Sequence, residues 1–160
     1  MKNIPSIIFA TFCLWISACT NTYDAPDNIN TKASLPDSFK FSPAGLKVIN
    51  SSINKIHGTM ATLYGNPLAL KKAIAFNSEK VAGEVFTLVT WKQQPDAHWF
   101  GANIPGDLQS VEVVKTTSYG DAVTISYQRY EGKNLTLNTD TVRQGERIKF
   151  IFDEKPSVMP

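Results

Sequence analysis

Hydrophobic and polar residues alternate along much of the chain, the pattern typical of β-strands. In residues 84–93 (EVFTLVTWKQ) both alternating sets are apolar or β-branched, which predicts a central strand covered on both faces. In residues 122–130 (AVTISYQRY) one set is largely apolar and the other polar, so one face of this strand should meet water. Further strands are expected at residues 57–64, 110–115 and 147–152.

One helix is clearly indicated between two of these strands. Asn66 is a good N-cap, and Pro67 stands at the first helical position, where its missing N–H costs nothing. An apolar stripe follows beside two lysines, so we expect a helix over residues 67–76. Between residues 42 and 55 a short helix is compatible with the pattern, and so is a strand at 46–49. Many strands and few helices predict an α+β fold, an antiparallel β-sheet packed with a few short helices.

The N-terminal stretch has the features of a targeting segment rather than of a folded element. Its apolar run from Ile4 to Ile16 is about a dozen residues long, shorter than the ~20 that a membrane-spanning helix needs. We therefore interpret residues 1–18 as a signal peptide. The run closes on Ile-Ser-Ala-Cys, which resembles a bacterial lipobox, so Cys19 is expected to carry a diacylglyceryl thioether. An ordinary secretory signal and an uncleaved anchor are the alternatives.

A lipidated Cys19 would make the mature protein an envelope lipoprotein attached to a membrane. A thioether-linked diacylglycerol plus an N-acyl chain binds a bilayer far more firmly than a single acyl chain, which gives only marginal attachment. Thr20 stands where an aspartate would favour the inner membrane, so the outer membrane is the expected destination. Because Cys13 would be removed with the signal peptide, no disulfide is expected.

Composition divides the rest of the chain into a linker and one domain. Residues 19–38 are rich in Pro, Asn and Asp, and their few apolar residues have no period, so a flexible tether is predicted. Residues 39–160 are long enough for a single hydrophobic core. The formal net charge is +2 and the basic residues are spread along the chain, which argues against nucleic acid as a partner. The sequence leaves the oligomeric state open.

The sequence offers one candidate binding loop, residues 96–106, directly after the predicted central strand. In a functional interpretation, His98 is a ligand or an acid–base group whose ring is oriented by Asp96. Trp99 and Phe100 then form an apolar wall of the site. In the alternative interpretation, the two aromatic residues close the end of the sheet and His98 is hydrogen-bonded to backbone. If the loop forms the site, His98 and Trp99 should border the main cavity of the domain.

Residues for a metal site or for nucleophilic catalysis are sparse. His57 and Met60 lie three apart, a spacing that could offer imidazole and thioether together to copper on a helix. On a strand, as predicted here, the two side chains would face opposite sides. Together with His98 they are weak candidates, and no dedicated metal site is expected. Because the chain contains no nucleophile motif and no phosphate-binding glycine loop, enzymatic activity is not predicted.

Two segments of the chain, taken in order, resemble the cytochrome P460 family. Residues 58–67 end in Gly-Asn-Pro before an Ala-containing helix, and residues 84–92 form a predicted strand that finishes in Trp-Lys. The similarity covers about half of the mature chain. The resemblance implies an antiparallel β-sheet packed with a few helices, with a pocket on one face of the sheet.

The chain departs from this family at the haem. True cytochromes of the family attach a c-type haem through C-x-x-C-H near the C-terminus and oxidise hydroxylamine or related nitrogen compounds. Here both cysteines precede the predicted domain, and residues 147–160 contain neither Cys nor His. Covalent haem is therefore excluded, and the activity of the family does not carry over.

The expected function is that of a binding or accessory module for a small, largely apolar ligand, held at a membrane by its lipid. No cofactor is predicted. The alternative is a redox or haem protein that binds haem non-covalently, with His98 or His57 as the axial ligand.

Overall fold

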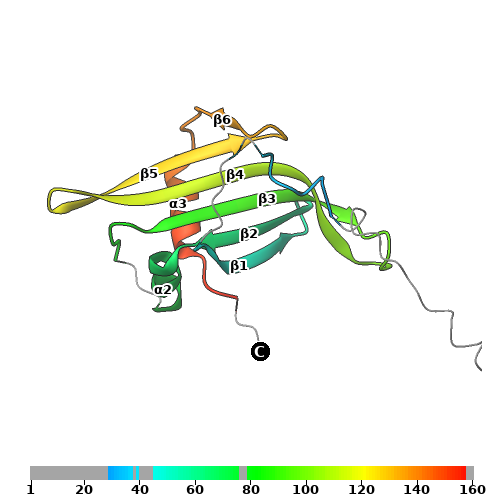
Figure 1. The fold of residues 1–160 in the computed structure, drawn as a ribbon, viewed down its shortest axis with the longest axis horizontal. Coiled ribbons are helices and arrows are strands. Elements are labelled where there is room, and N and C mark those ends of the chain that lie inside the picture. The colour runs from blue at the N-terminus through cyan, green and yellow to red at the C-terminus, as the bar shows by residue number, and fades with distance from the viewer. Residues whose placement is uncertain (1–28, 38, 40–44, 76–78, 158–160) are drawn as a thin grey trace, which may run out of the picture. The chain divides into compact units, whose positions relative to one another are not determined.

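The structure is a computed structural model, and it describes residues 29–37, 39, 45–75 and 79–157 (Figure 1). The predicted signal peptide and Cys19 lie outside the described residues. The chain divides into two compact units, residues 1–30 and 31–160, and the second contains every described helix and strand.

The second unit is a six-stranded antiparallel sheet with two short helices, which confirms the predicted α+β fold. Each strand pairs with the next strand in the chain, so the sheet is a simple meander (Figure 1). The strands and helices, in chain order, are β1 (Lys47–Asn54), β2 (Thr59–Gly65), α2 (Pro67–Ala75), β3 (Val85–Pro95), β4 (Asn103–Tyr119), β5 (Ala122–Glu131), β6 (Thr136–Asn138) and α3 (Gln144–Asp153).

The predicted central strand is confirmed as β3, which lies between β2 and β4 in the sheet. The prediction at 110–115 is part of a much longer strand, β4, which pairs with β3 on one side and with β5 on the other. Of the two alternatives left open before Lys55, the strand is correct, because β1 occupies residues 47–54.

Helix α2 begins where the sequence predicts. The side-chain oxygen of Asn66 accepts a hydrogen bond from the backbone N–H of Ala69 at 3.0 Å, so Asn66 caps the helix. Gly65 permits the close approach of this helix to the sheet. A Cβ atom on Gly65 would lie 2.9 Å from Cβ of Ala69 on the helix, closer than real Cβ atoms come to a neighbour.

The strand predicted at residues 147–152 is wrong, because this segment forms helix α3. Its apolar residues fit both the two-residue period of a strand and the 3.6-residue period of a helix. Ile148, Ile151 and Phe152 follow the helical spacing and pack on the sheet, with Ile151 completely buried. The alternating set would instead have buried Phe150, whose side chain is 42% exposed. Among the described residues, no helix is long and apolar enough to cross a membrane.

Each face of the sheet carries its own hydrophobic cluster. On the helix face, the face that α2 and α3 cover, the buried residues are Ile49, Leu63, Ala69, Ala73, Phe86, Leu88, Val114 and Ile151. On the opposite face, which we call the N-terminal face, the buried residues are Val89, Leu108, Val111 and Leu135. The cover of the N-terminal face includes Leu35 and Phe39, which precede the first strand.

The predicted boundary between tether and domain therefore lies too late in the chain. The indole N–H of Trp91 donates a hydrogen bond to the carbonyl of Ala33 at 2.8 Å. The ring of Phe39 packs edge-to-face on Tyr130, with centroids 5.0 Å apart. Residues from 31 onward belong to the compact unit rather than to a tether that ends at 38. Their apolar residues have no period because they cover a sheet face as an irregular segment.

Candidate functional site

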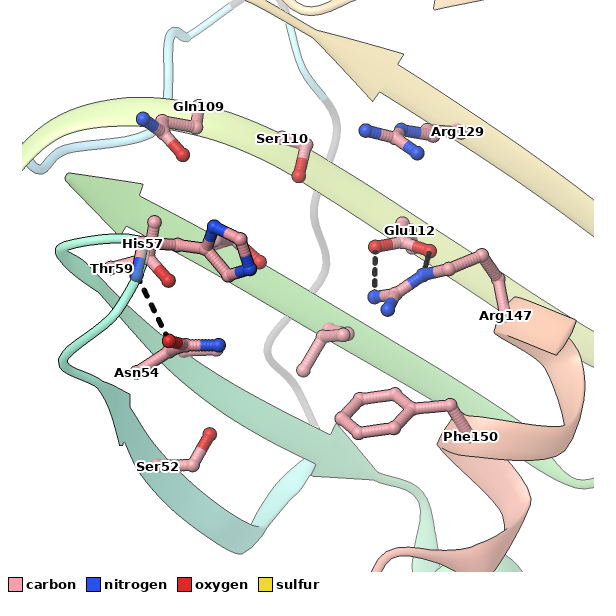
Figure 2. A pocket seen from close by; sticks show the side chains of 13 residues that line it. Ser52, Asn54, His57, Thr59, Gln109, Ser110, Glu112, Arg129, Arg147 and Phe150 are labelled. Atoms are coloured by element: carbon pink, nitrogen blue, oxygen red, sulfur yellow. Dashed lines mark hydrogen bonds and ion pairs between the residues drawn. The ribbon is translucent and has the colours of Figure 1, made fainter. Parts of the chain in front are cut away.

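The helix face is hollowed beside α3 into a cavity of about 330 Å³. We call it the helix-face cavity (Figure 2). Strands β1 to β5 form its floor, beside the residues on which the helices pack, and α3 forms one side. Its lining combines many polar side chains with a few apolar ones: Ser52, Asn54, His57, Thr59, Ala61, Leu88, Thr90, Gln109, Ser110, Glu112, Arg129, Arg147 and Phe150.

Strand alternation explains how one face of the sheet serves both core and cavity. Along β4, Val114 lies in the core of the helix face, and Glu112 and Ser110, two and four residues earlier, line the cavity. Along β3 the same change occurs between Phe86 in the core and Thr90 in the cavity. The inward-facing positions thus turn polar where the helices no longer cover them.

Glu112 is the buried charge of the cavity. Its side chain is 2% exposed, and both carboxylate oxygens are hydrogen-bonded. Arg147 of α3 donates to them from Nε at 2.9 Å and from Nη2 at 2.7 Å (Figure 2). The hydroxyl of Tyr127 donates to Oε2 at 2.6 Å. This bidentate pair neutralises the carboxylate and ties α3 to β4.

The network shifts the pKa values of both partners of Glu112. Hydrogen bonds to Glu112 raise the pKa of the Arg147 guanidinium, so it stays charged. Burial, together with the hydrogen bond to Glu112, raises the pKa of the Tyr127 phenol above its ordinary value. Tyr127 therefore remains a neutral donor to the carboxylate.

Tyr127 should make the free energy of unfolding fall as pH rises above about 10. In that range the phenol is deprotonated in the unfolded chain, where its pKa is near 10.0, and still protonated in the folded protein. Its contribution is complete below that pH and is lost as pH rises through the folded pKa. Urea unfolding of wild type and Tyr127→Phe between pH 9 and 11 should give a shallower decrease for the variant. Parallel curves would contradict this assignment.

Arg129 is the second cation of the cavity. Its Nη2 pairs with Glu131 Oε1 at 2.7 Å, at the partly exposed end of the side chain. Its Nε is buried, and no acceptor among the described residues bonds to it. Figure 2 shows the Arg129 side chain extending from β5 over the cavity, on the side of Ser110 and Glu112. Since Glu112 is already neutralised by Arg147, the Nε–H of Arg129 is a hydrogen-bond donor that no described residue uses.

The far wall of the cavity comes from the turn between β1 and β2. The backbone N–H of His57 donates to the side-chain oxygen of Asn54 at 3.1 Å, which holds this turn. Phe150 of α3 contributes an apolar wall, and its ring lies 4.8 Å from the guanidinium carbon of Arg147. The cavity thus offers several hydrogen-bond donors and a small apolar surface.

The sequence-predicted loop lies elsewhere. Asp96, His98, Trp99 and Phe100 occupy the turn between β3 and β4 and do not line the helix-face cavity. The Asp96 carboxylate accepts hydrogen bonds from the backbone N–H groups of His98 at 2.7 Å and Trp99 at 3.3 Å, so it holds the backbone of the turn. His98 and Trp99 do not border the helix-face cavity, and a binding role for their loop stays a prediction. The predicted loop also ends earlier, because residues 103–106 belong to β4.

Of the weak metal candidates, His57 lines the cavity and Met60 does not. Met60 lies between Thr59 and Ala61 on β2, both of which line the cavity, so it faces the other side of the sheet. The described part of the chain contains no group of three or more His, Cys, Asp or Glu side chains that could hold a metal. A non-covalent haem in this cavity would have His57 as its histidine neighbour.

Sequence reasoning missed the three charged residues that define the cavity. Glu112 stands between valines in a predicted strand, and a carboxylate in such a place needs a cation partner. That signal was available, but the partner, Arg147, lies 35 residues away on an element predicted with the wrong period. Arg129 stands at the end of the largely apolar alternating set of the strand predicted at residues 122–130, where a charged side chain is unusual.

Comparison with known proteins finds no family model that matches the chain and no matching curated protein. The resemblance to the cytochrome P460 family therefore stays a prediction from the two sequence segments.

Proposed function

We propose that the protein is a lipid-anchored binding module that holds a small ligand with an anionic oxygen in the helix-face cavity. The observation that carries this proposal is the buried Nε–H of Arg129, which has no acceptor among the described residues. An unsatisfied buried donor costs about 1–3 kcal/mol. A carboxylate oxygen of a ligand in the cavity would relieve that cost.

The size and lining of the cavity support a small polar ligand. A volume of about 330 Å³ lies at the lower end of the range of roughly 300–1,000 Å³ usual for ligand sites. The hydroxyl groups of Thr90 and Ser110 can bond to further polar atoms of a ligand, and Leu88 and Phe150 offer an apolar surface. This lining changes the expected ligand from largely apolar to polar with a small apolar part.

The proposed anchor rests on the lipobox that ends at Cys19. An acylated module of this kind would act at the surface of a bacterial envelope membrane, with the outer membrane the favoured site. The proposal assigns the domain no reaction.

The test is a set of thermal unfolding measurements on the mature protein with benzoate, succinate and glutamate, each beside its neutral amide. At least one carboxylate should raise the melting temperature more than its amide, because ligand at 100 times Kd stabilises by about 2.7 kcal/mol. Arg129→Gln should abolish this difference. Arg143→Gln is the matched control, because Arg143 is an exposed arginine that does not line the cavity.

Two results would overturn the proposal. One is an equal response to acids and amides in the wild-type protein. The other is a carboxylate response that survives in Arg129→Gln, since Arg129 would then not be the residue that holds the carboxylate. The surface pair of Arg129 with Glu131 contributes at most about 1 kcal/mol, so the variant should remain folded.

A further inference from the structure

Three highly exposed apolar side chains lie at one end of the sheet. Trp99 is 72% exposed and Phe100 is fully exposed, both in the turn between β3 and β4, and Ile56, in the turn between β1 and β2, is 91% exposed. The two turns lie at the same end, because the first residue of β2 pairs with Lys92 near the end of β3 (Figure 1). We call these three residues the apolar tip.

The turn that carries Trp99 and Phe100 is held in place by hydrogen bonds. Besides the two bonds to the Asp96 carboxylate, the backbone N–H of Asp96 donates to the carbonyl of Ala102 at 3.0 Å. The N–H of Ala102 donates to the carbonyl of Trp99, also at 3.0 Å. Two adjacent large apolar residues are therefore presented outward by a structured turn.

The hairpin of β3 and β4 also projects beyond its neighbour in the sheet. The pairing of β2 with β3 ends at Lys92, whereas β3 and β4 stay paired as far as Pro95 and Asn103. The apolar tip thus includes the part of the sheet that extends furthest at this end (Figure 1).

The chain enters the domain at the same end. Ala33 is fixed by its hydrogen bond to Trp91, four residues before Pro95 on β3. Cys19, the proposed acylation site, precedes Ala33 by 14 residues. Even fully extended, a segment of that length spans at most about 50 Å. The lipid must therefore lie within that distance of Ala33.

The two ends of the sheet differ in their access to the lipid. Pro95 lies about 13 Å along β3 from Trp91, at about 3.3 Å per residue. Tyr119, at the opposite hairpin, lies about 37 Å along β4 from Leu108, the partner of Trp91, at about 3.4 Å per residue. A segment stretched to about three-quarters of its greatest length would be needed to bring that opposite end to the bilayer.

We propose that the apolar tip inserts into the interface of the bilayer that holds the Cys19 lipid, so that the sheet stands on the membrane at this end. This inference rests on the lipid anchor proposed above. Trp is enriched at membrane–water interfaces because its ring is apolar and its N–H is polar. Insertion would cover Trp99, Phe100 and Ile56, and it would bring the His57 side of the helix-face cavity next to the lipid headgroups.

The test uses tryptophan fluorescence of the mature acylated protein in vesicles of phosphatidylcholine and phosphatidylglycerol. Cleavage before Cys19 leaves two tryptophans, Trp91 and Trp99. Vesicles with brominated acyl chains should quench the wild-type emission, and Trp99→Phe should lose that quenching. Trp99→Phe combined with Tyr119→Trp places the probe on the exposed opposite hairpin, and its added emission should not be quenched.

The proposal would be overturned if Trp99 of vesicle-bound protein is not quenched, or if a tryptophan at 119 is quenched equally. A blue shift of Trp99 that depends on protein concentration, without quenching by bromine, would also overturn it, because another protein would then cover the tip. Failure of the anchor is recognised separately: wild type and Cys19→Ser would then show the same absence of palmitate label. In that case both the anchor and the insertion are rejected.

Discussion

Replacing Arg147 with Met should lower the free energy of unfolding by about 3 kcal/mol. The substitution leaves the Glu112 carboxylate, 2% exposed, without its cation but still hydrogen-bonded to the Tyr127 hydroxyl. Removing one partner of a buried ion pair costs about 3–5 kcal/mol. We expect the lower end of this range, because the Arg147 side chain is 32% exposed and water can approach the carboxylate once it is removed. Urea unfolding measures the change, with the slope against denaturant unchanged.

Two matched variants show whether the loss of stability comes from the Glu112 carboxylate left without a cation. Glu112→Gln combined with Arg147→Met removes both charges and should recover much of the loss, because an amide can still accept from Tyr127. Arg143→Met, on an exposed arginine one turn earlier, should stay within about 0.5 kcal/mol of wild type. An Arg147→Met protein as stable as the Arg143→Met control would show that Glu112 does not depend on this pair.

The local elements of the fold could be predicted because each depends on residues close in sequence. Alternation alone gives β3 and β5, and the Asn66–Pro67 pair gives the start of α2. For α3 the sequence fits two periods, since Ile148, Phe150 and Phe152 alternate while Ile148, Ile151 and Phe152 follow a helix. Only the place of this segment, packed across the finished sheet, decides between them.

The cavity could not be predicted, because it depends on register between distant residues. Glu112 meets Tyr127 only because Val113 of β4 pairs with Gln128 of β5. Arg147 reaches Glu112 only because α3 packs on that face. By contrast, the cluster from Asp96 to Phe100 is visible in the sequence as a dense group of functional residue types. The same composition, however, suits an exposed turn, and the structure has it there.

The role of residues 31–39 in covering the sheet could not be predicted from the sequence either. Leu35 and Phe39 have no periodic neighbours, so composition places them in a linker. Both pack on the N-terminal face, where Phe39 contacts Tyr130 of β5, while Trp91 of β3 holds the same segment through Ala33. A segment that covers a sheet face without forming a strand leaves no pattern in the sequence.

Replacing Trp91 with Ala should lower the free energy of unfolding by about 3 kcal/mol and loosen the segment that it holds. Removing a large aromatic side chain from a core costs about 3–5 kcal/mol, and we expect the lower end because Trp91 is only partly buried. The variant also loses the hydrogen bond to Ala33, which fixes the start of the domain. Thermal unfolding gives the stability, and hydrogen exchange at residues 31–37 gives the second effect.

Trp91→Phe separates the two contributions of this side chain. A phenyl ring keeps much of the contact with the buried cluster that contains Val89 but has no N–H for the Ala33 carbonyl. Loss of one neutral hydrogen bond should cost about 1 kcal/mol, while exchange at residues 31–37 should rise nearly as far as in Trp91→Ala. Unchanged exchange in both variants would mean that the segment is held by Phe39 and Tyr130 instead. A Trp91→Ala protein that melts within a few degrees of wild type would show that β3 does not depend on Trp91 for its packing.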